Sequence, residues 1–169
     1  MPTVSVLDST MFYRASGDGT PVVLLHGNPA SSYGWRKVIP YLPPQVRALA
    51  PDLIGMGRSG KPDIDYRFAD HANYLDAWFD TLALENVVLI GHDWGGALAM
   101  DWAARHPERV RGIVLMETIL RPMTWEDFPG PHRARYEAIR SPGSGEAMVL
   151  DDNFFIETAL AATIRNGLS

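Results

Sequence analysis

The stretch VVLIGHDWGGALAM, residues 87–100, constrains the fold more than any other part of the chain. Val87–Ile90 is wholly apolar, the pattern of a strand buried on both faces, and the alanine-rich run at 95–105 is typical of a helix. Glycines lie two residues before and two residues after Asp93. This spacing predicts a sharp strand-to-helix turn that presents a reactive side chain, with aspartate where many such turns carry serine.

The same alternation of strand and helix patterns recurs along the first two thirds of the sequence. Strands are expected at 4–7, 10–13, 22–25, 46–50, 87–90 and 110–116, and helices at 31–41, 68–84 and 95–105. Strands that alternate with helices form a mostly parallel sheet with helices on both faces. The sequence therefore predicts the α/β class.

The character of the sequence changes after Glu117. Residues 121–150 are rich in proline, glycine and charge, and 152–162 is a further helix candidate. Nothing after Met116 has the pattern of a buried strand. We therefore expect two parts, a sheet-containing core at 1–120 and a partial helical layer, or cap, at 121–169.

Composition excludes several classes of function. The net charge is −5 and no cluster of Lys and Arg offers a footprint for phosphates, so neither nucleic acid nor a membrane is an expected partner. The chain has no cysteine, which excludes a thiolate nucleophile, a cysteine metal site and disulfides. The N-terminus shows no secretory signal and no apolar run reaches membrane-spanning length, so a cytoplasmic location is expected.

Polar residues follow the expected strands at the edge where an open α/β sheet binds its ligands. Asp93 would lie at the head of a helix, whose N–H groups favour an anion, although an aspartate here is also a common helix N-cap. Asn28 follows the strand at 22–25 and, with Trp94, would supply backbone N–H groups to an oxyanion hole. The simpler alternative for Asn28 is a turn residue before proline. His26 is expected to be a packed histidine that satisfies loop backbone.

Glu117 directly follows the strand at 110–116. An acid there suits the orientation of a catalytic histidine, and a solvated loop carboxylate is the alternative. His71 and His106 are expected on or beside surface helices, and His92 is expected to point away from the pocket.

An aspartate nucleophile indicates a reaction class. A carboxylate that attacks an sp³ carbon forms an ester that water can cleave, whereas serine would form a stable ether. The target is then an alkyl halide or an epoxide. A departing halide needs N–H donors such as Asn28 and the Trp94 indole, and an epoxide oxygen needs an acidic O–H, for which Tyr33 and Tyr136 are the candidates.

Four segments carry a resemblance to a known family. HGNPASSYGWR (26–36), APDLIGMGRSGKPD (50–63), GHDWGGAL (91–98) and HPERVRGIVLMET (106–118) resemble the haloalkane dehalogenases of the α/β-hydrolase fold. GHDWGG alone is less specific, because epoxide hydrolases look similar there. The resemblance implies the nucleophile at Asp93, the acid that orients a histidine at Glu117, and the halide ligands and the oxyanion-hole N–H groups at Asn28 and Trp94.

The resemblance also implies the reaction partners and a pocket. The substrate is a small halogenated alkane, water is the second reactant, halide is released, and no metal or organic cofactor is needed. Phe128, Phe154 and Phe155 would line an apolar pocket between cap and sheet, with plain packing inside the cap as the alternative.

The chain departs from the family pattern in one respect. In the family the catalytic histidine follows the last strand, whereas here only His132 follows Glu117, in the cap segment. The resemblance therefore implies an N-terminal part without the final strands or the catalytic histidine, and self-association through the exposed sheet edge. Two alternatives remain open: an epoxide hydrolase, and a non-catalytic chain that needs a complementing partner.

Overall fold

The computed structural model describes residues 2–128 and 130–163. The chain divides into two compact units, Met1–Leu120 and Arg121–Ser169.

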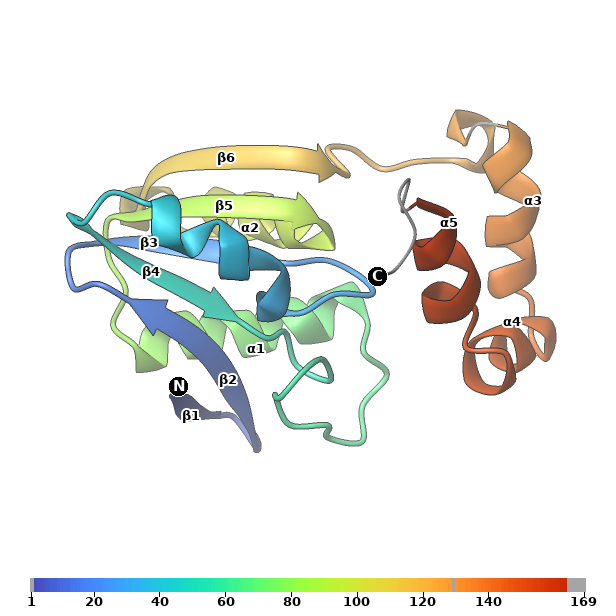
Figure 1. The fold of residues 1–169 in the computed structure, drawn as a ribbon, viewed down its shortest axis with the longest axis horizontal. Coiled ribbons are helices and arrows are strands. Elements are labelled where there is room, and N and C mark those ends of the chain that lie inside the picture. The colour runs from blue at the N-terminus through green and yellow to red at the C-terminus, as the bar shows by residue number, and fades with distance from the viewer. Residues whose placement is uncertain (1, 129, 164–169) are drawn as a thin grey trace. The chain divides into compact units, whose positions relative to one another are not determined.

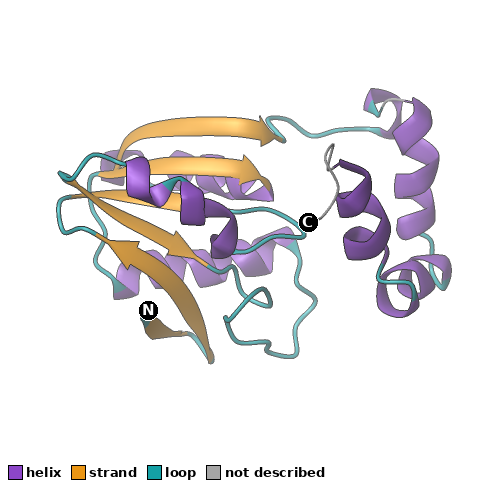
Figure 2. Ribbon diagram, viewed as in Figure 1, coloured by secondary structure: helices purple, strands orange, loops and turns teal. Residues whose placement is uncertain are grey.

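The first unit is built on a six-stranded sheet with the order β1–β2–β4–β3–β5–β6 (Figures 1 and 2). The strands are β1 Thr3–Val6, β2 Ser9–Ser16, β3 Thr20–Leu25, β4 Val46–Pro51, β5 Val87–Asp93 and β6 Val110–Thr118. β1 and β2 pair antiparallel, as do β2 and β4, and the remaining pairs are parallel. The predicted α/β class with a mostly parallel sheet is confirmed.

Alternating side chains of β3 enter two different cores. Val23 and Leu25 pack into the larger core with the helices α1 Phe68–Thr81 and α2 Trp94–Arg105. Val22 and Leu24 pack on the opposite face, together with Trp35. Both faces of the strand are therefore buried, which explains its continuous apolar sequence.

The segment predicted as a helix at 31–41 differs from the expectation. It forms two short 3₁₀ turns, η1 Ser32–Lys37 and η2 Ile39–Tyr41, which cover the second face of the sheet (Figure 1). Pro40 lies in the first turn of η2, where its missing N–H is tolerated. In this segment Trp35 and Ile39 pack on the sheet, and Val38 is exposed.

β6 ends the strand order, and none of its nine residues is buried. Ile113, Val114 and Met116 are large apolar side chains exposed on this strand. Apolar residues on an edge strand favour pairing with another chain.

The second unit contains helices, joined by turns and loops, and no strand among its described residues. Its elements are η4 Trp125–Asp127, α3 Gly130–Ile139, α4 Ser144–Glu146, the π-helical turns η5 Ala147–Asp151 and η6 Phe155–Leu160, and α5 Ala161–Thr163. Arg121 donates to Asp127 at the start of the unit, 2.5 Å between Nη2 and Oδ1. In the part of the chain that the structure describes, no helix is both long and apolar enough to cross a membrane.

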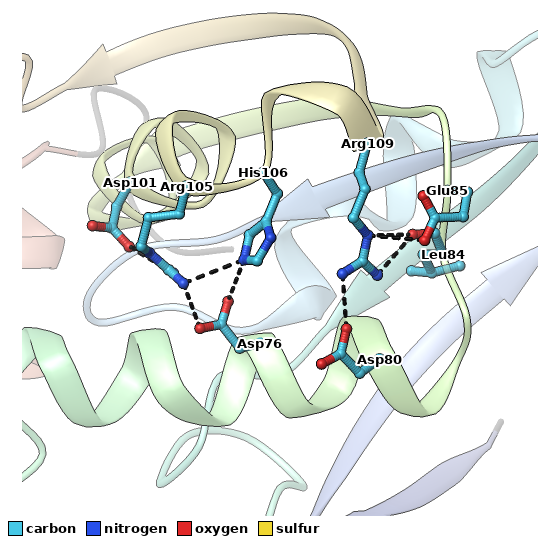
Figure 3. A network of polar contacts seen from close by, with 8 residues as sticks. All are labelled: Asp76, Asp80, Leu84, Glu85, Asp101, Arg105, His106 and Arg109. Atoms are coloured by element: carbon cyan, nitrogen blue, oxygen red, sulfur yellow. Dashed lines mark hydrogen bonds and ion pairs between the residues drawn. The ribbon is translucent and has the colours of Figure 1, made fainter.

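Arg105 joins α1 to α2 through ion pairs (Figure 3). Its guanidinium lies 2.5 Å from Asp76 of α1 and 2.8 Å from Asp101 of α2. The burial cost of these charges is offset because each nitrogen faces a carboxylate.

Arg109 makes a second connection at the end of the η3 turn, Pro107–Arg109 (Figure 3). It donates to the Leu84 carbonyl, 3.0 Å from Nη2, and forms ion pairs with Asp80 at 2.8 Å and Glu85 at 3.0 Å. Its side chain is only 13% exposed. The guanidinium therefore holds the end of α1 against the turn that leads into β6.

We predict that Arg109→Ala lowers the free energy of unfolding by about 2 kcal/mol, because the carbonyl of the buried residue Leu84 loses a charged donor. Urea unfolding followed by circular dichroism measures the change. Arg67→Ala is the matched control, since it removes only the exposed Arg67–Asp65 pair, and should cost less than about 0.5 kcal/mol. Equal losses in the two variants would contradict the assignment.

Candidate active site

Asp93 lies at the turn between β5 and α2 and has φ 54° and ψ −129°. Few side chains adopt this backbone conformation, and such residues concentrate at functional sites. The flanking glycines make the turn possible. A Cβ on Gly91 would lie 2.5 Å from the Gly96 Cα, and one on Gly95 would lie 2.4 Å from the Leu25 carbonyl oxygen.

The Asp93 carboxylate accepts a hydrogen bond from the Asn28 backbone N–H, 2.9 Å from Oδ1. It makes no capping hydrogen bond to α2, so the N-cap alternative is wrong for this side chain. The Asp93 carbonyl accepts from the Thr118 hydroxyl at 2.5 Å. A Cβ on Gly27 would lie 2.1 Å from Oδ1, so only glycine lets the Asn28 loop approach the carboxylate this closely.

His26 is buried beneath this loop. Its Nδ1 donates to the Gly27 carbonyl at 2.9 Å, and its Nε2 accepts from the Leu53 N–H at 3.0 Å. Burial lowers its pKa from the usual 6.5, which favours the neutral ring. The prediction of a packed histidine that satisfies loop backbone is confirmed.

A cavity of about 400 Å³ opens beside Asp93 within the first unit. Its lining is mostly apolar and comes from the Asn28 loop, the loop after β4, and α1 and α2: Asn28, Leu53, Ile54, Gly55, Met56, Tyr66, Phe68, His71, Trp94 and Leu98. Asp93 is not one of the lining residues, but its hydrogen-bond partner Asn28 and its neighbour Trp94 are. Among the described residues, neither the Asn28 side-chain amide nor the Trp94 indole N–H has a hydrogen-bond partner. Two N–H donors are thus available to a ligand.

Sequence reasoning missed two of the polar residues that line the cavity. His71 was expected on a surface helix. It does lie on α1, but its ring lines the cavity, Nδ1 is buried without a partner among the described residues, and burial lowers its pKa. Tyr66 precedes α1, and its hydroxyl donates to the Pro62 carbonyl at 2.6 Å. Helical periodicity does not identify either residue as part of a cavity, because Tyr66 precedes α1 and His71 lies in its first turn.

Glu117 is an extra residue in the ladder between β5 and β6. His92 pairs with Met116 and Asp93 pairs with Thr118, so Glu117 is left over as a bulge, with φ 42°. Its side chain is 92% exposed, and Oε2 lies 4.0 Å from His92 Nε2. Bulges re-aim side chains and are common beside active sites.

The remaining aromatic candidates belong to other segments of the chain. Phe128, Phe154 and Phe155 belong to the second unit and make ring contacts there: Phe128 with Trp125 and Tyr136, and Phe154 with Phe155. These contacts fit the packing alternative. Tyr33 is exposed in η1, with the Arg36 guanidinium 3.9 Å from its ring centroid. The side chain of His132 lies outside the part of the chain that the structure describes.

Groups of three or more side chains able to hold a metal ion are not found among the described residues. The polar groups around Asp93 are N–H donors and a hydroxyl. This arrangement suits the stabilisation of negative charge.

The turn at Asp93, the N–H loop opposite it and the mostly parallel sheet together define an α/β hydrolase. The sequence profile of the alpha/beta hydrolase fold matches residues 20–141, and the chain belongs to this family. Within the fold, the proteins it is similar to are haloalkane dehalogenases. One from Mesorhizobium japonicum is 52% identical over 98% of this chain, and one from Sphingobium indicum is 46% identical over 98%.

Solved structures agree with the sequence comparison. The crystal structure of a putative ancestral haloalkane dehalogenase covers 100% of this chain with a TM-score of 0.94 and 54% identity. That of a haloalkane dehalogenase from Bradyrhizobium elkani covers 99% with a TM-score of 0.94 and 50% identity. The resemblance seen in the sequence is confirmed. This chain spans 55% of the Mesorhizobium relative and 60% of the ancestral protein.

We predict that Gly27→Ala lowers the free energy of unfolding by about 1–3 kcal/mol, because the new methyl group overlaps the Asp93 carboxylate. Gly34→Ala is the control, since a Cβ there has no neighbour within 4 Å. Urea unfolding compares the two. A smaller loss for Gly27→Ala than for Gly34→Ala would contradict the close approach of loop and carboxylate.

Proposed function

We propose that this chain carries the nucleophilic half of a haloalkane dehalogenase, which converts a small halogenated alkane and water to an alcohol and halide. One observation carries the proposal. Asn28 hydrogen-bonds Asp93 through its backbone N–H, and its side chain lines an apolar cavity together with Trp94. This arrangement supports a nucleophilic role for Asp93, with N–H donors beside a cavity suited to an alkyl group.

In the first half-reaction an Asp93 carboxylate oxygen attacks the halogen-bearing carbon. The carbon–halogen bond breaks as the ester bond forms, and the electron pair leaves with the halide. The Asn28 amide and the Trp94 indole are proposed to donate to the halide. The hydrogen bond from the Asn28 backbone N–H to Asp93 Oδ1, 2.9 Å long, supports this proposal, because it keeps Asn28 beside the attacking carboxylate.

In the second half-reaction water attacks the ester carbonyl carbon, and the alcohol leaves as the Asp93 carboxylate re-forms. The Asn28 and Trp94 N–H groups are proposed to stabilise the oxyanion, and Trp94 is the first residue of α2, where backbone N–H groups lack partners within the helix. Glu117 is the proposed acid that orients a histidine base. Among the described side chains, no histidine hydrogen-bonds to Asp93 or to Glu117, and the nearest to Glu117 is His92 at 4.0 Å.

The donors in the cavity favour a halide over an epoxide. An epoxide oxygen needs an acidic O–H, and the tyrosine that lines the cavity is Tyr66. Its hydroxyl proton is committed to the Pro62 carbonyl. Tyr33, one of the two tyrosines considered from the sequence, does not line the cavity.

Intact mass spectrometry after incubation with 1-bromobutane tests the proposal. We expect the chain to gain one butyl group at Asp93, and the ester to accumulate because no described histidine contacts Asp93 to activate water. Asp93→Ala should remain unmodified, and Glu108→Ala, which removes an exposed acid of η3, should be alkylated as before.

A second arm uses styrene oxide. Modification of Asp93 by the epoxide, with none by bromobutane, would support an epoxide hydrolase instead. An unshifted mass with both reagents would contradict a formed nucleophile site and support the non-catalytic alternative.

The second unit is proposed to be the start of a helical cap, with Phe128, Phe154 and Phe155 as its apolar lining. Their half-buried rings, and the ring contacts of Phe128 with Tyr136 and of Phe154 with Phe155, support an apolar surface in this unit. A cytoplasmic location also stays a prediction, which fractionation of cells that express the chain would test.

We further propose that the chain self-associates through β6, because this edge strand exposes Val114 and its neighbours. A lysine on an edge strand opposes such pairing. Sedimentation equilibrium should show a smaller mean mass for Val114→Lys than for the unsubstituted chain. Tyr41→Lys, at an exposed site in η2, should leave the mass unchanged, and equal effects of the two variants would argue against the β6 edge.

A further inference from the structure

Two loops meet beside the nucleophile. The loop at 26–32 supplies the Asn28 N–H, and the loop at 52–60 supplies the cavity wall from Leu53 to Met56. Neither loop is held by regular ladder hydrogen bonds at these residues. Their relative position therefore depends on specific side chains.

His26 makes the first connection between the loops. Because the Gly27 carbonyl can only accept, the proton of the neutral ring lies on Nδ1. Nε2 is then free to accept from the Leu53 N–H at 3.0 Å. The His26 imidazole thus links the loop at 26–32 to Leu53, the first residue of the cavity wall.

Asp52 makes the second connection. Its side chain is buried, and each carboxylate oxygen accepts a backbone N–H: Oδ1 from Ser32 at 2.7 Å and Oδ2 from Arg58 at 2.8 Å. A Cβ on Gly57 would lie 2.2 Å from Oδ2, so the loop wraps closely around the carboxylate. Ser59 adds a third hydrogen bond, from its hydroxyl to the Asp52 carbonyl at 2.6 Å.

We propose that His26 and Asp52 are a pair of positioning residues that fix the Asn28 N–H on Asp93 and the cavity wall beside it. The proposal rests on the proposed role of Asp93 as the nucleophile. His26 holds the beginning of the Asn28 loop and Asp52 holds its end, so that Asn28 lies between two fixed points. Neither residue touches the substrate.

The connection through His26 requires a neutral ring. A proton on Nε2 would turn the acceptor into a donor that faces the Leu53 N–H, and the link would break. The charged groups that His26 senses are Asp52 and Asp93, which favour its protonation, and His71, which opposes it. Burial is the dominant influence and lowers the pKa below 6.5, so the link is intact at neutral pH and is lost only in more acidic solution.

The first test follows the Asn28 and Leu53 amides by ¹⁵N–¹H NMR in the chain with Asp52→Asn. The asparagine side chain has an NH₂ group in place of one carboxylate oxygen, so the N–H of either Ser32 or Arg58 then faces a donor. We expect the Asn28 amide resonance to shift, and alkylation of Asp93 by 1-bromobutane to slow by about 10- to 100-fold, as for a misplaced reacting group. Asp63→Asn is the control, because it makes the same charge change at an exposed residue of the same region. Identical resonances and rates in the two variants would overturn the proposal.

The second test is the pH profile, which a merely structural role would not change. In the unsubstituted chain, the Leu53 and Asn28 resonances should change together in one transition below pH 6.5. His26→Gln can still accept from the Leu53 N–H but cannot titrate, so it should keep the rate at neutral pH and lose this transition. His26→Ala should lose rate at every pH.

These readouts separate the two proposals. If bromobutane never alkylates Asp93, the proposed function fails, and the Asn28 resonance still decides whether His26 and Asp52 position the loop. If Asp52→Asn does not fold, the His26→Gln profile decides. A transition of the Leu53 resonance that persists unchanged in His26→Gln would overturn the proposal.

Discussion

The close approach of backbone to backbone at the turn between β5 and α2 is the constraint on which the rest of the structure depends. Gly91 and Gly95 leave no room for a side chain, and Asp93 is held with a positive φ between them. The sheet supplies the support for this strained conformation, because Thr118 of β6 donates to the Asp93 carbonyl. As a result, the carboxylate projects from a rigid junction rather than from a mobile loop, and the loop opposite it can be placed against a fixed point.

Backbone N–H groups stabilise the carboxylates near this junction. Asp93 accepts from the Asn28 N–H, and Asp52 accepts from two further N–H groups although its side chain is buried. A buried carboxylate is stable only where such hydrogen bonds replace its hydration. His26 remains neutral beside both, which avoids a buried cation and lets one ring nitrogen accept. The hydrogen bonds that stabilise the buried Asp52 and His26 side chains also hold the loops at 26–32 and 52–60 in place.

The sheet was largely predictable because its signals are local. Each expected strand is present within a few residues. The continuous apolar run of β3 follows from its burial on both faces. The segment at 31–41 was predicted less well, because Pro40 divides it into two short turns and Val38 is exposed. In the candidate site, Asp93, Asn28 and Trp94 were predicted from their places after the expected strands, and the structure brings them close together. His71 and Asp52 were missed, because each acquires its importance from residues distant in the sequence.

The sequence by itself determined the class of fold, and it supplied the prediction of a nucleophile at Asp93. Glycine spacing around an aspartate after an apolar run specifies a turn that few other folds use, and a carboxylate there predicts attack on an alkyl carbon. Only the tertiary structure decided which groups surround that carboxylate. The bulge at Glu117 arises from the register between two strands, and the His26 and Asp52 contacts arise from loops that meet across the sheet edge. Such contacts join residues distant along the chain, so no local pattern encodes them.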